Sequence, residues 1–323
     1  MIPKKLAKEL PELKEKVLLK NYTTYKIGGP AKYFFIAKNK DELIRALELA
    51  KKNKLPVFIL GGGSNLLVSD KGFKGLVIKM DICGMELMEN QAMIGAGEGL
   101  TRIANLCAKN GLSGLEWSAG IPGTIGGAVY GHAQAFGTKI SSSIKGVEVI
   151  DTKNLKIKKL TREQCKFSLK NSIFKKNKNL VIVSVLLEFE KAGLEEIENK
   201  IKEFLNYRKA RHPMNFPSAG STFVNPEVKI KNKKLLKEFP ELVNFNLQGA
   251  IPAGYLVQKC GIQGKKIGKA QISNKHANFI VNLGGARAKD VFALMTLARK
   301  KVKEKFGVNL ETEVQFVGFN AKL

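Results

Sequence analysis

The sequence feature that most constrains this chain is the glycine-rich stretch GLSGLEWSAGIPGTIGGAVYGHAQAFG at residues 111–137. It holds eight glycines in 27 residues, and they are mixed with apolar residues rather than with serine and charge. A flexible linker has a different composition. Glycines in an apolar segment indicate backbone that closely approaches a ligand or another part of the chain. Residues 118–131 therefore suit either a ring or a diphosphate lying on bare backbone, or the close packing of two segments.

A second glycine tract, GGGSN at residues 61–65, directly follows the apolar run LPVFIL (55–60). Three glycines leave backbone N–H groups unscreened, and successive N–H groups can form a concavity that binds phosphate oxygens. Ser64 and Asn65 add side-chain hydrogen-bonding groups. The tract lacks the Lys-Ser/Thr ending of a P-loop and the GxGxxG spacing of a dinucleotide-binding turn. A phosphate cradle and a plain tight turn both remain open, and neither an ATPase nor a GTPase is indicated.

Helical and strand-like patterns alternate along the chain, which predicts an α/β architecture. A helix is expected over 39–54, where Asn39 caps the first turn and Glu42 follows three residues later. The other expected helices are 1–20, 100–110, 194–206 and 290–306, and the expected strands include 55–60, 75–80, 146–151 and 180–189.

The end of the chain, VNLETEVQFVGF, alternates apolar and polar residues and predicts one final strand. Glu311 and Glu313 then share one face of that strand. Like-charge repulsion between them is expected to raise a carboxyl pKa and to favour an acid role. The proline-bounded loop 212–226 marks a domain boundary near residues 190–215.

Composition excludes several classes of protein. The 323 residues are 44% hydrophobic and 26% charged, which is typical of a globular protein. No apolar run reaches the roughly 18 residues of a transmembrane helix, and the charged N-terminus lacks the apolar core of a signal peptide. We therefore expect a cytoplasmic protein. Four scattered cysteines and three histidines, without CxxC or HExxH, predict no metal site.

The formal net charge of +27 is large. A nucleic-acid-binding protein is one interpretation, but only the charge supports it, because no nucleic-acid motif and no interleaved aromatic residues accompany it. A solvated lysine-rich surface, whose field attracts small anionic substrates, is the interpretation we favour. We expect neither a nucleic-acid nor a membrane partner.

Seven segments in order resemble the UDP-N-acetylenolpyruvoylglucosamine reductase family. They are YKIGGPA (25–31), LGGGSNLLVSD (60–70), GLSGLEWSAGIPGTIGGAVYG (111–131), CKFSLKNSIF (165–174), SAGSTFVNP (218–226), AGYLVQKCGIQGKKIGKAQISNKHANFIVN (253–282) and LETEVQFVG (310–318). Phe189 leads within a few residues into the 194–206 helix, which resembles the shorter, second type of this family. A sugar or lactone oxidase of the same fold is the alternative, but it would lack the SAGSTF and LETEV segments.

The resemblance implies a mixed α+β and α/β fold. An FAD-binding fold of the vanillyl-alcohol-oxidase type (the PCMH type) is expected in two subdomains, followed by a C-terminal α+β substrate-binding domain whose last strand returns toward the flavin. The expected boundaries are an N-terminal helix at 1–20, FAD-binding subdomains at 21–80 and 81–192, and the substrate-binding domain at 193–323.

The resemblance also implies the chemistry. NADPH reduces non-covalently bound FAD, and the flavin passes a hydride to the vinyl carbon of UDP-N-acetylglucosamine enolpyruvate, giving UDP-N-acetylmuramate for peptidoglycan synthesis. Ser221 matches the proton-donating serine and Glu313 the catalytic glutamate. Lys170 stands where the family usually has arginine, and we expect it to neutralise the substrate carboxylate and the developing enolate. The family suggests a monomer in which NADPH and substrate share one pocket.

Two further groups of residues follow from the matching segments. The expected cofactor-binding residues are Gly61, Gly62, Gly63, Ser64, Asn65, Ser118, Ile121, Pro122, Gly123, Thr124, Gly126 and Gly127. The candidate contacts to the diphosphate, uracil or sugar of the substrate are Asn225, Tyr255, Gln258, Lys259 and Asn278. The chain departs from the family at Val224, and at His132-Ala133, where Asn-Ala is usual.

Overall fold

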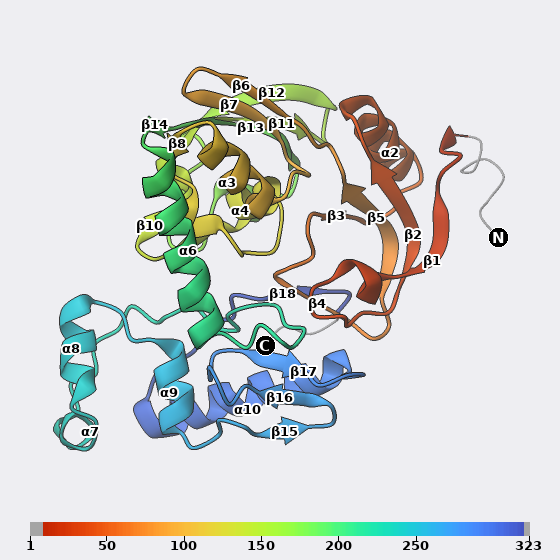
Figure 1. The fold of residues 1–323 in the computed structure, drawn as a ribbon. Helices are drawn as coiled ribbons and strands as arrows, with labels where there is room; N and C mark the ends of the chain where they lie inside the picture. The colour runs from red at the N-terminus through yellow and green to blue at the C-terminus, as the bar shows by residue number, and fades with distance from the viewer. Residues whose placement is uncertain (1–8, 320–323) are drawn as a thin grey trace. The chain divides into compact units, whose positions relative to one another are not determined.

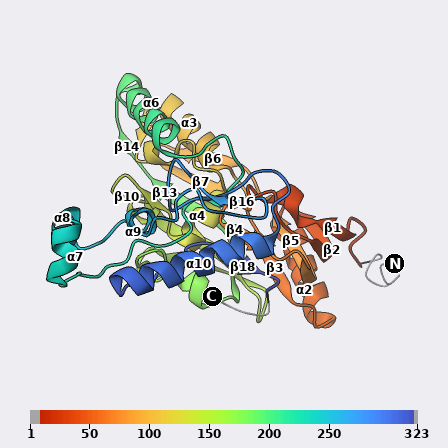
Figure 2. The same ribbon diagram turned by 90° about the horizontal axis from the view of Figure 1, so that it is seen from below.

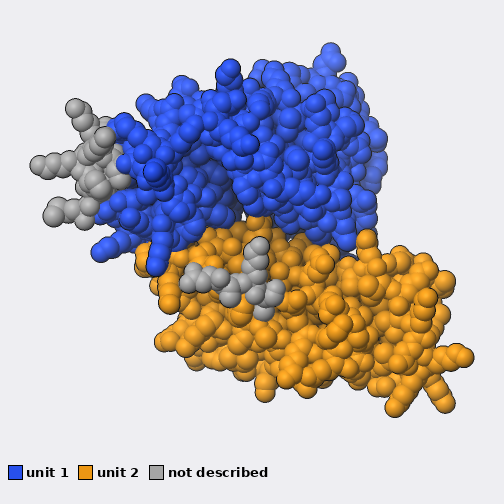
Figure 3. Space-filling model, turned by 180° about the vertical axis from the view of Figure 1, so that it is seen from behind, with its two compact units in different colours: residues 1–17, 31–63, 73–210 blue, residues 18–30, 64–72, 211–323 orange. Residues whose placement is uncertain are grey.

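The structure, a computed structural model, describes residues 9–319 (Figure 1) and divides into two compact units (Figure 3). Unit 1 contains the N-terminal segment up to Val17 with Ala31–Gly63 and Phe73–Ala210. Unit 2 contains Leu18–Pro30, Ser64–Gly72 and the chain from Arg211 onward. Each unit is thus assembled from segments that are distant in sequence. The division into subdomains at residues 20, 80 and 192 stays a prediction.

The first sheet of unit 1 is built around parallel strand pairs. Its order is β1-β2-β5-β3, formed by Lys14–Leu18, Pro30–Ala37, Phe73–Met80 and Val57–Leu60. Strand β5 pairs in parallel with β2 and β3, and helix α2 (Lys40–Lys52) connects β2 to β3, as parallel strands require. The predicted cap is confirmed, because Asn39 Oδ1 accepts a hydrogen bond from the N–H of Glu42 at 2.9 Å.

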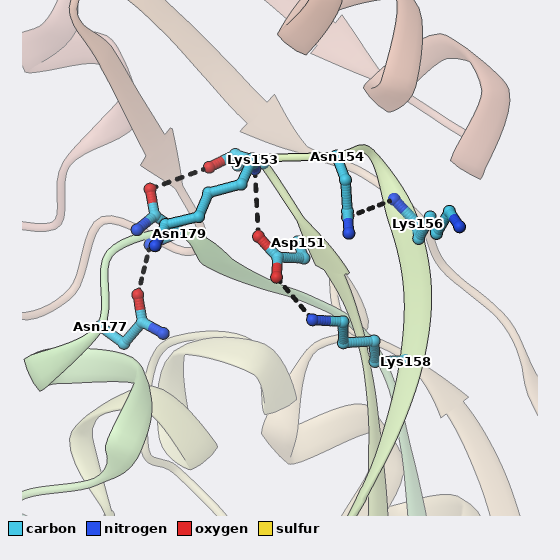
Figure 4. A network of polar contacts seen from close by, with 8 residues as sticks. Asp151, Lys153, Asn154, Lys156, Lys158, Asn177 and Asn179 are labelled. Carbon is cyan, nitrogen blue, oxygen red and sulfur yellow. Dashed lines mark hydrogen bonds and ion pairs between the residues drawn. The ribbon is translucent and has the colours of Figure 1, made fainter.

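The second sheet of unit 1 is antiparallel, with the order β12-β11-β13-β7-β6. Its strands are Lys156–Thr161, Ile144–Asp151, Leu180–Glu188, Gln91–Gly95 and Met85–Met88. Asp151 fixes the turn between β11 and β12 (Figure 4). Its carboxylate accepts hydrogen bonds from Lys158 Nζ at 2.6 Å and from the N–H of Lys153 at 3.0 Å, and these contacts lower the pKa of Asp151.

Helices and short strand pairs complete unit 1. They are α3 (Leu100–Lys109), α4 (Ile125–Gly131), α5 (Ile173–Lys176), α6 (Leu194–Arg211), the pair β8 (Leu112–Ser113) with β14 (Glu190–Lys191), the pair β9 (Gln134–Ala135) with β10 (Thr138–Lys139), and the 3-10 turns Glu116–Ser118 and Ile140–Ser142. Helix α6 extends five residues beyond the end predicted at residue 206, to Arg211.

Unit 2 combines a three-stranded antiparallel sheet, β15-β16-β17, with a parallel pair, β4-β18. The strands are Lys266–Ile267, Ala270–Ile272, Ile280–Asn282, Leu66–Val68 and Gln315–Val317, and the helices are α7 (Lys233–Glu238), α8 (Glu241–Gln248), α9 (Ala253–Lys259) and α10 (Ala288–Phe306). Helix α10 packs against β15, β16 and α9. Figure 2 shows α10 as a long blue helix.

Tyr25 explains why an N-terminal segment belongs to unit 2. Its side chain is 2% exposed in the core of that unit, and its hydroxyl donates a hydrogen bond to the Ile280 carbonyl at 2.7 Å. The side-chain amide of Asn282 donates to the Tyr25 carbonyl at 3.0 Å. Burial of an aromatic ring stabilises such a contact by about 1.5–3 kcal/mol.

Two predicted elements are wrong. The helix expected over 1–20 does not extend through residues 10–20, where the structure has the strand β1 at Lys14–Leu18 and a 3-10 turn at Leu19–Tyr22; Glu9 is helical, and residues 1–8 lie outside the described residues. The expected final strand over 308–319 is shorter, because only Gln315–Val317 pairs, with β4. Thr312 forms an isolated bridge with Phe223 instead. Among the described residues, no helix is both long and apolar enough to cross a membrane.

Candidate active site

In unit 1 the two glycine tracts lie against each other. A Cβ atom added to Gly62 would lie 2.5 Å from the Cα of Gly123, and one added to Gly61 would lie 2.8 Å from Thr124 Oγ1. Real Cβ atoms do not approach backbone this closely, so only glycine fits at position 62. The close packing of two segments is thus one reason for these glycines.

Unpaired backbone donors gather at the same junction. In the described part of the chain, the N–H groups of Gly61, Gly62, Gly63, Gly123 and Thr124 have no hydrogen-bond partner. The Thr124 side chain caps helix α4 by accepting from the N–H of Gly127 at 3.3 Å. Backbone donors in a glycine-rich concavity are the groups that bind phosphate oxygens.

Arg208 supports the loop that leads into this junction. Its guanidinium donates to the carbonyls of Trp117, at 2.9 Å, and Ala119, at 3.2 Å, and it lies over the ring of Phe136. Ser118, between the two carbonyls, is fully buried, and its hydroxyl donates to the Leu115 carbonyl. Ser118 therefore holds the loop internally.

Lys170 occupies the third position of a tight turn in unit 1. Ser168 and Asn171 exchange backbone hydrogen bonds of 3.1 and 3.0 Å across this turn. Lys170 has a φ of 50°, a left-handed conformation that is uncommon for a residue with a side chain. The backbone that carries the half-buried Lys170 side chain is therefore strained and has a closely defined conformation.

In unit 2, Ser221 precedes a segment that pairs with the chain leading to Glu313. The N–H of Glu313 donates to the Thr222 carbonyl at 2.9 Å. The N–H of Val224 donates to the Glu311 carbonyl, also at 2.9 Å. The structure thus brings Ser221 and Glu313 into adjacent segments, and the half-buried Glu313 contrasts with the exposed Glu311.

Asn65 belongs to the same cluster. Its side-chain amide donates to the Glu313 carbonyl at 3.1 Å, and its own carbonyl accepts from the N–H of Gln315 at 3.0 Å. The last segment of the glycine tract, with Ser64, therefore lies in unit 2 beside Glu313, whereas Gly61–Gly63 belong to unit 1.

Asn278 holds the backbone next to Ser221. Its side chain is 3% exposed, and its Oδ1 and Nδ2 atoms bind the N–H and carbonyl of Phe223, each at 2.9 Å. Its own carbonyl accepts from the N–H of Thr222 at 2.7 Å. The side chain predicted as a ligand contact thus orders the segment that carries Ser221.

The remaining ligand candidates gather at helix α9. Asn225 Oδ1 accepts a hydrogen bond from the N–H of Ala253 at the start of this helix. Tyr255 and Lys259 both bind the carboxylate of Glu241, at 3.0 and 3.3 Å. Burial and this carboxylate raise the pKa of Tyr255.

Gln258 is exposed on the same helix. Of the cofactor candidates in unit 1, Pro122 and Gly127 are also exposed, Ile121 is partly buried, and Gly126 packs against Ala96. Lys170 belongs to unit 1, whereas Ser221, Glu313 and all five ligand candidates belong to unit 2.

Sequence reasoning missed three residues of unit 1. Arg208 lies beyond the predicted end of its helix, and its only sequence signal is an arginine in a chain rich in lysine. Gln134 has a buried Nε2 atom, the only buried side-chain nitrogen or oxygen without a partner among the described residues. For His132, the sequence shows only a departure from the family pattern and gives no sign of its contacts. Within residues 9–319, no three His, Cys, Asp or Glu side chains gather to hold a metal ion.

Comparisons with known proteins agree with this geometry. A model for the "FAD binding domain" matches residues 31–160, and a model for "UDP-N-acetylenolpyruvoylglucosamine reductase, C-terminal domain" matches residues 212–317. The reductase of Bacillus subtilis (strain 168) is 38% identical over 98% of this chain and 100% of its own length. That of Clostridium novyi (strain NT) is 37% identical over 95% of this chain and 92% of its own length.

A solved structure is similar over nearly the whole chain. The crystal structure of UDP-N-acetylenolpyruvylglucosamine reductase from Thermus caldophilus has a TM-score of 0.73 and 32% identity, covering 94% of this chain and 98% of that one. The fold and the family models define an FAD-dependent oxidoreductase, and the predicted fold class is confirmed. The chain belongs to the UDP-N-acetylenolpyruvoylglucosamine reductase family, which acts in peptidoglycan precursor synthesis.

The residues of unit 1 fit FAD. The five unpaired N–H groups at the glycine junction match the acceptor oxygens of a diphosphate. The buried Nε2 of Gln134, which has no partner in the described part of unit 1, is a donor that an acceptor atom of a bound group would satisfy. Gly61–Gly63, Gly123 and Thr124 would hold the diphosphate of the cofactor.

Proposed function

We propose that this chain catalyses the NADPH-dependent reduction of UDP-N-acetylglucosamine enolpyruvate to UDP-N-acetylmuramate. The observation that carries the proposal is the pairing in unit 2 that sets Ser221 and Glu313 on adjacent segments. Membership of the reductase family supports the UDP-sugar substrate. The preference for NADPH, the monomeric state and the cytoplasmic location stay predictions.

Each proposed catalytic group has a distinct task. Bound FAD would supply the means to transfer a hydride from NADPH to the vinyl carbon of the substrate, and Gly61–Gly63, Gly123 and Thr124 would hold its diphosphate. Negative charge then develops toward the substrate carboxylate, and the Lys170 ammonium neutralises it. The Ser221 hydroxyl gives its proton to the carbon next to the carboxylate, and Glu313 assists this transfer from the neighbouring segment.

The other candidates hold the substrate in place. Asn225, Tyr255, Gln258 and Lys259 lie at or beside helix α9, where amide, phenol and ammonium donors suit a sugar diphosphate. Asn278 has an indirect role, because its hydrogen bonds to the Phe223 backbone fix the segment that carries Ser221. We propose that NADPH enters the same pocket before the substrate does.

The test is NADPH oxidation by the flavin-loaded chain, with and without the enolpyruvyl substrate, together with detection of UDP-N-acetylmuramate. Substrate-dependent oxidation that yields this product supports the proposal, and a parallel assay with NADH tests the cofactor preference. Bound flavin without substrate-dependent turnover would contradict it and favour another oxidoreductase.

A further inference from the structure

His132 contacts the turn that carries Lys170. Its Nδ1 atom lies 2.6 Å from the carbonyl oxygen of Ser168, the first residue of that turn, and its Nε2 atom lies 2.8 Å from Ser141 Oγ. The ring is 4% exposed and stacks on Phe167 with a centroid distance of 4.9 Å. A buried imidazole with a partner on both nitrogens has one orientation.

The partners also define the protonation of His132. A carbonyl oxygen only accepts, so Nδ1 carries the hydrogen, and a neutral ring then accepts from the Ser141 hydroxyl at Nε2. Burial lowers the pKa of His132, and the charges of Lys139 and Lys170 act in the same direction, whereas the hydrogen bond to the Ser168 carbonyl opposes the shift without reversing it. The neutral Nδ1–H tautomer satisfies every polar atom of this contact.

The turn is attached to the end of helix α4 at a second point. The buried Ser172 hydroxyl donates to the carbonyl of Tyr130 at 2.7 Å, and Lys175 Nζ donates to the Lys170 carbonyl at 2.6 Å. His132 directly follows helix α4 and has a φ of 48°. The first residue of the Lys170 turn, Ser168, and the residue just after it, Ser172, are therefore both bound to one helix end.

We propose that His132 is a positioning residue that fixes Lys170 for the reduction, through the hydrogen bond from Nδ1–H to the Ser168 carbonyl. This inference rests on the role of Lys170 in the proposed function. A displacement of about 1 Å at a charge-stabilising group can lower a rate about 100-fold. Loss of the Ser168 contact is therefore expected to lower kcat by about 10- to 100-fold.

Two substitutions separate the two ring nitrogens. In His132→Asn, the shorter amide places a donor near the Nδ1 position, and asparagine tolerates the left-handed backbone. In His132→Gln, the longer amide reaches the Ser141 hydroxyl and leaves the Ser168 carbonyl without its donor. We expect kcat close to wild type for His132→Asn and the 10- to 100-fold loss for His132→Gln. Equal loss in both variants, with flavin content retained, would overturn the inference.

The coupling to Lys170 distinguishes positioning from a structural role. If His132 acts through Lys170, then His132→Gln lowers kcat in the wild-type background and has no further effect in a Lys170→Met background. Multiplicative effects would assign His132 a role independent of Lys170. If Lys170→Met alone leaves kcat unchanged, the proposed role of Lys170 fails, which is a separate result.

A readout independent of activity completes the test. The ¹⁵N chemical shifts of the His132 ring in the flavin-loaded protein report which nitrogen carries the hydrogen. The Nδ1–H tautomer, retained in a Ser141→Ala variant, is the expected result. A ring with hydrogen only on Nε2 would contradict the proposed contact.

Discussion

At the scale of single residues, Lys170 carries the charge that a carboxylate and a developing enolate require. An ammonium is a point charge, whereas a guanidinium binds a carboxylate with two parallel hydrogen bonds. We expect Lys170→Arg to raise kcat/KM about tenfold and Lys170→Met to lower it about 100-fold. Steady-state NADPH oxidation measures both values.

Lys176→Met, which removes an exposed charge in α5, serves as the control. An unchanged kcat/KM in Lys170→Arg would show that lysine does not limit the reaction.

Asn278 is a residue whose effect is on stability as well as on activity. Asn278→Ala leaves the buried N–H and carbonyl of Phe223 without partners, which is expected to cost about 2–4 kcal/mol of unfolding free energy. Urea denaturation measures the loss, and the exposed Asn244→Ala in α8 is the matched control. A loss of less than about 0.5 kcal/mol, which is the range of ordinary surface substitutions, would show that the Asn278 side chain does not hold the Phe223 backbone.

At the scale of elements, the glycine junction is set by the approach of two backbones. Gly62→Ala places a methyl group 2.5 Å from Gly123 Cα, so the two tracts have to separate. Such overpacking costs about 1–3 kcal/mol, and we expect FAD affinity to fall at least about tenfold. Flavin titration followed by fluorescence measures the change.

Gly131→Ala provides the control for the glycine junction. A Cβ atom at Gly131, the last residue of α4, meets nothing within 4 Å. This variant is expected to bind FAD like the unsubstituted chain. Equal affinities for the Gly62 and Gly131 variants would show that the contact between the tracts does not support the cofactor.

Local patterns predicted the elements that depend on local interactions. The cap of α2 follows from Asn39 and Glu42, and the apolar runs at 55–60 and 75–80 correspond to β3 and β5. The N-terminal strand β1 and the short β18 could not be predicted this way, because their partner strands lie elsewhere in the sequence. The same limit applies to the site residues. The resemblance identifies Ser221 and Glu313, whereas the hydrogen bonds of Asn278 to Phe223 and the contact of His132 with Ser168 depend on tertiary packing and have no local sequence signal.

At the scale of the whole molecule, the buried His132 and the half-buried His276 link stability to pH. Burial lowers the pKa of His132 in unit 1 and of His276 in unit 2. The unfolded chain, in which histidine titrates near 6.5, then binds the protons more tightly than the folded chain. Their contribution to stability is therefore complete above that pH and is lost as pH falls through the folded pKa values.

The expected slope is at most about 2.7 kcal/mol per pH unit for two histidines. Urea denaturation between pH 7.5 and pH 5 measures it, in a range above the titration of ordinary carboxylates. The variant His132→Asn is expected to show about half of the slope. Identical slopes in the variant and the unsubstituted chain would show that His132 is protonated equally in both states.

The central claim is that Ser221 delivers the proton to the reduced substrate. The most direct measurement is an anaerobic stopped-flow experiment on Ser221→Ala, with Ser218→Ala from the same loop as the control. The account predicts that NADPH reduces the flavin at the normal rate in both variants. It also predicts that reoxidation by the enolpyruvyl substrate slows at least about 100-fold in Ser221→Ala alone. Reoxidation at the normal rate in Ser221→Ala would contradict the claim.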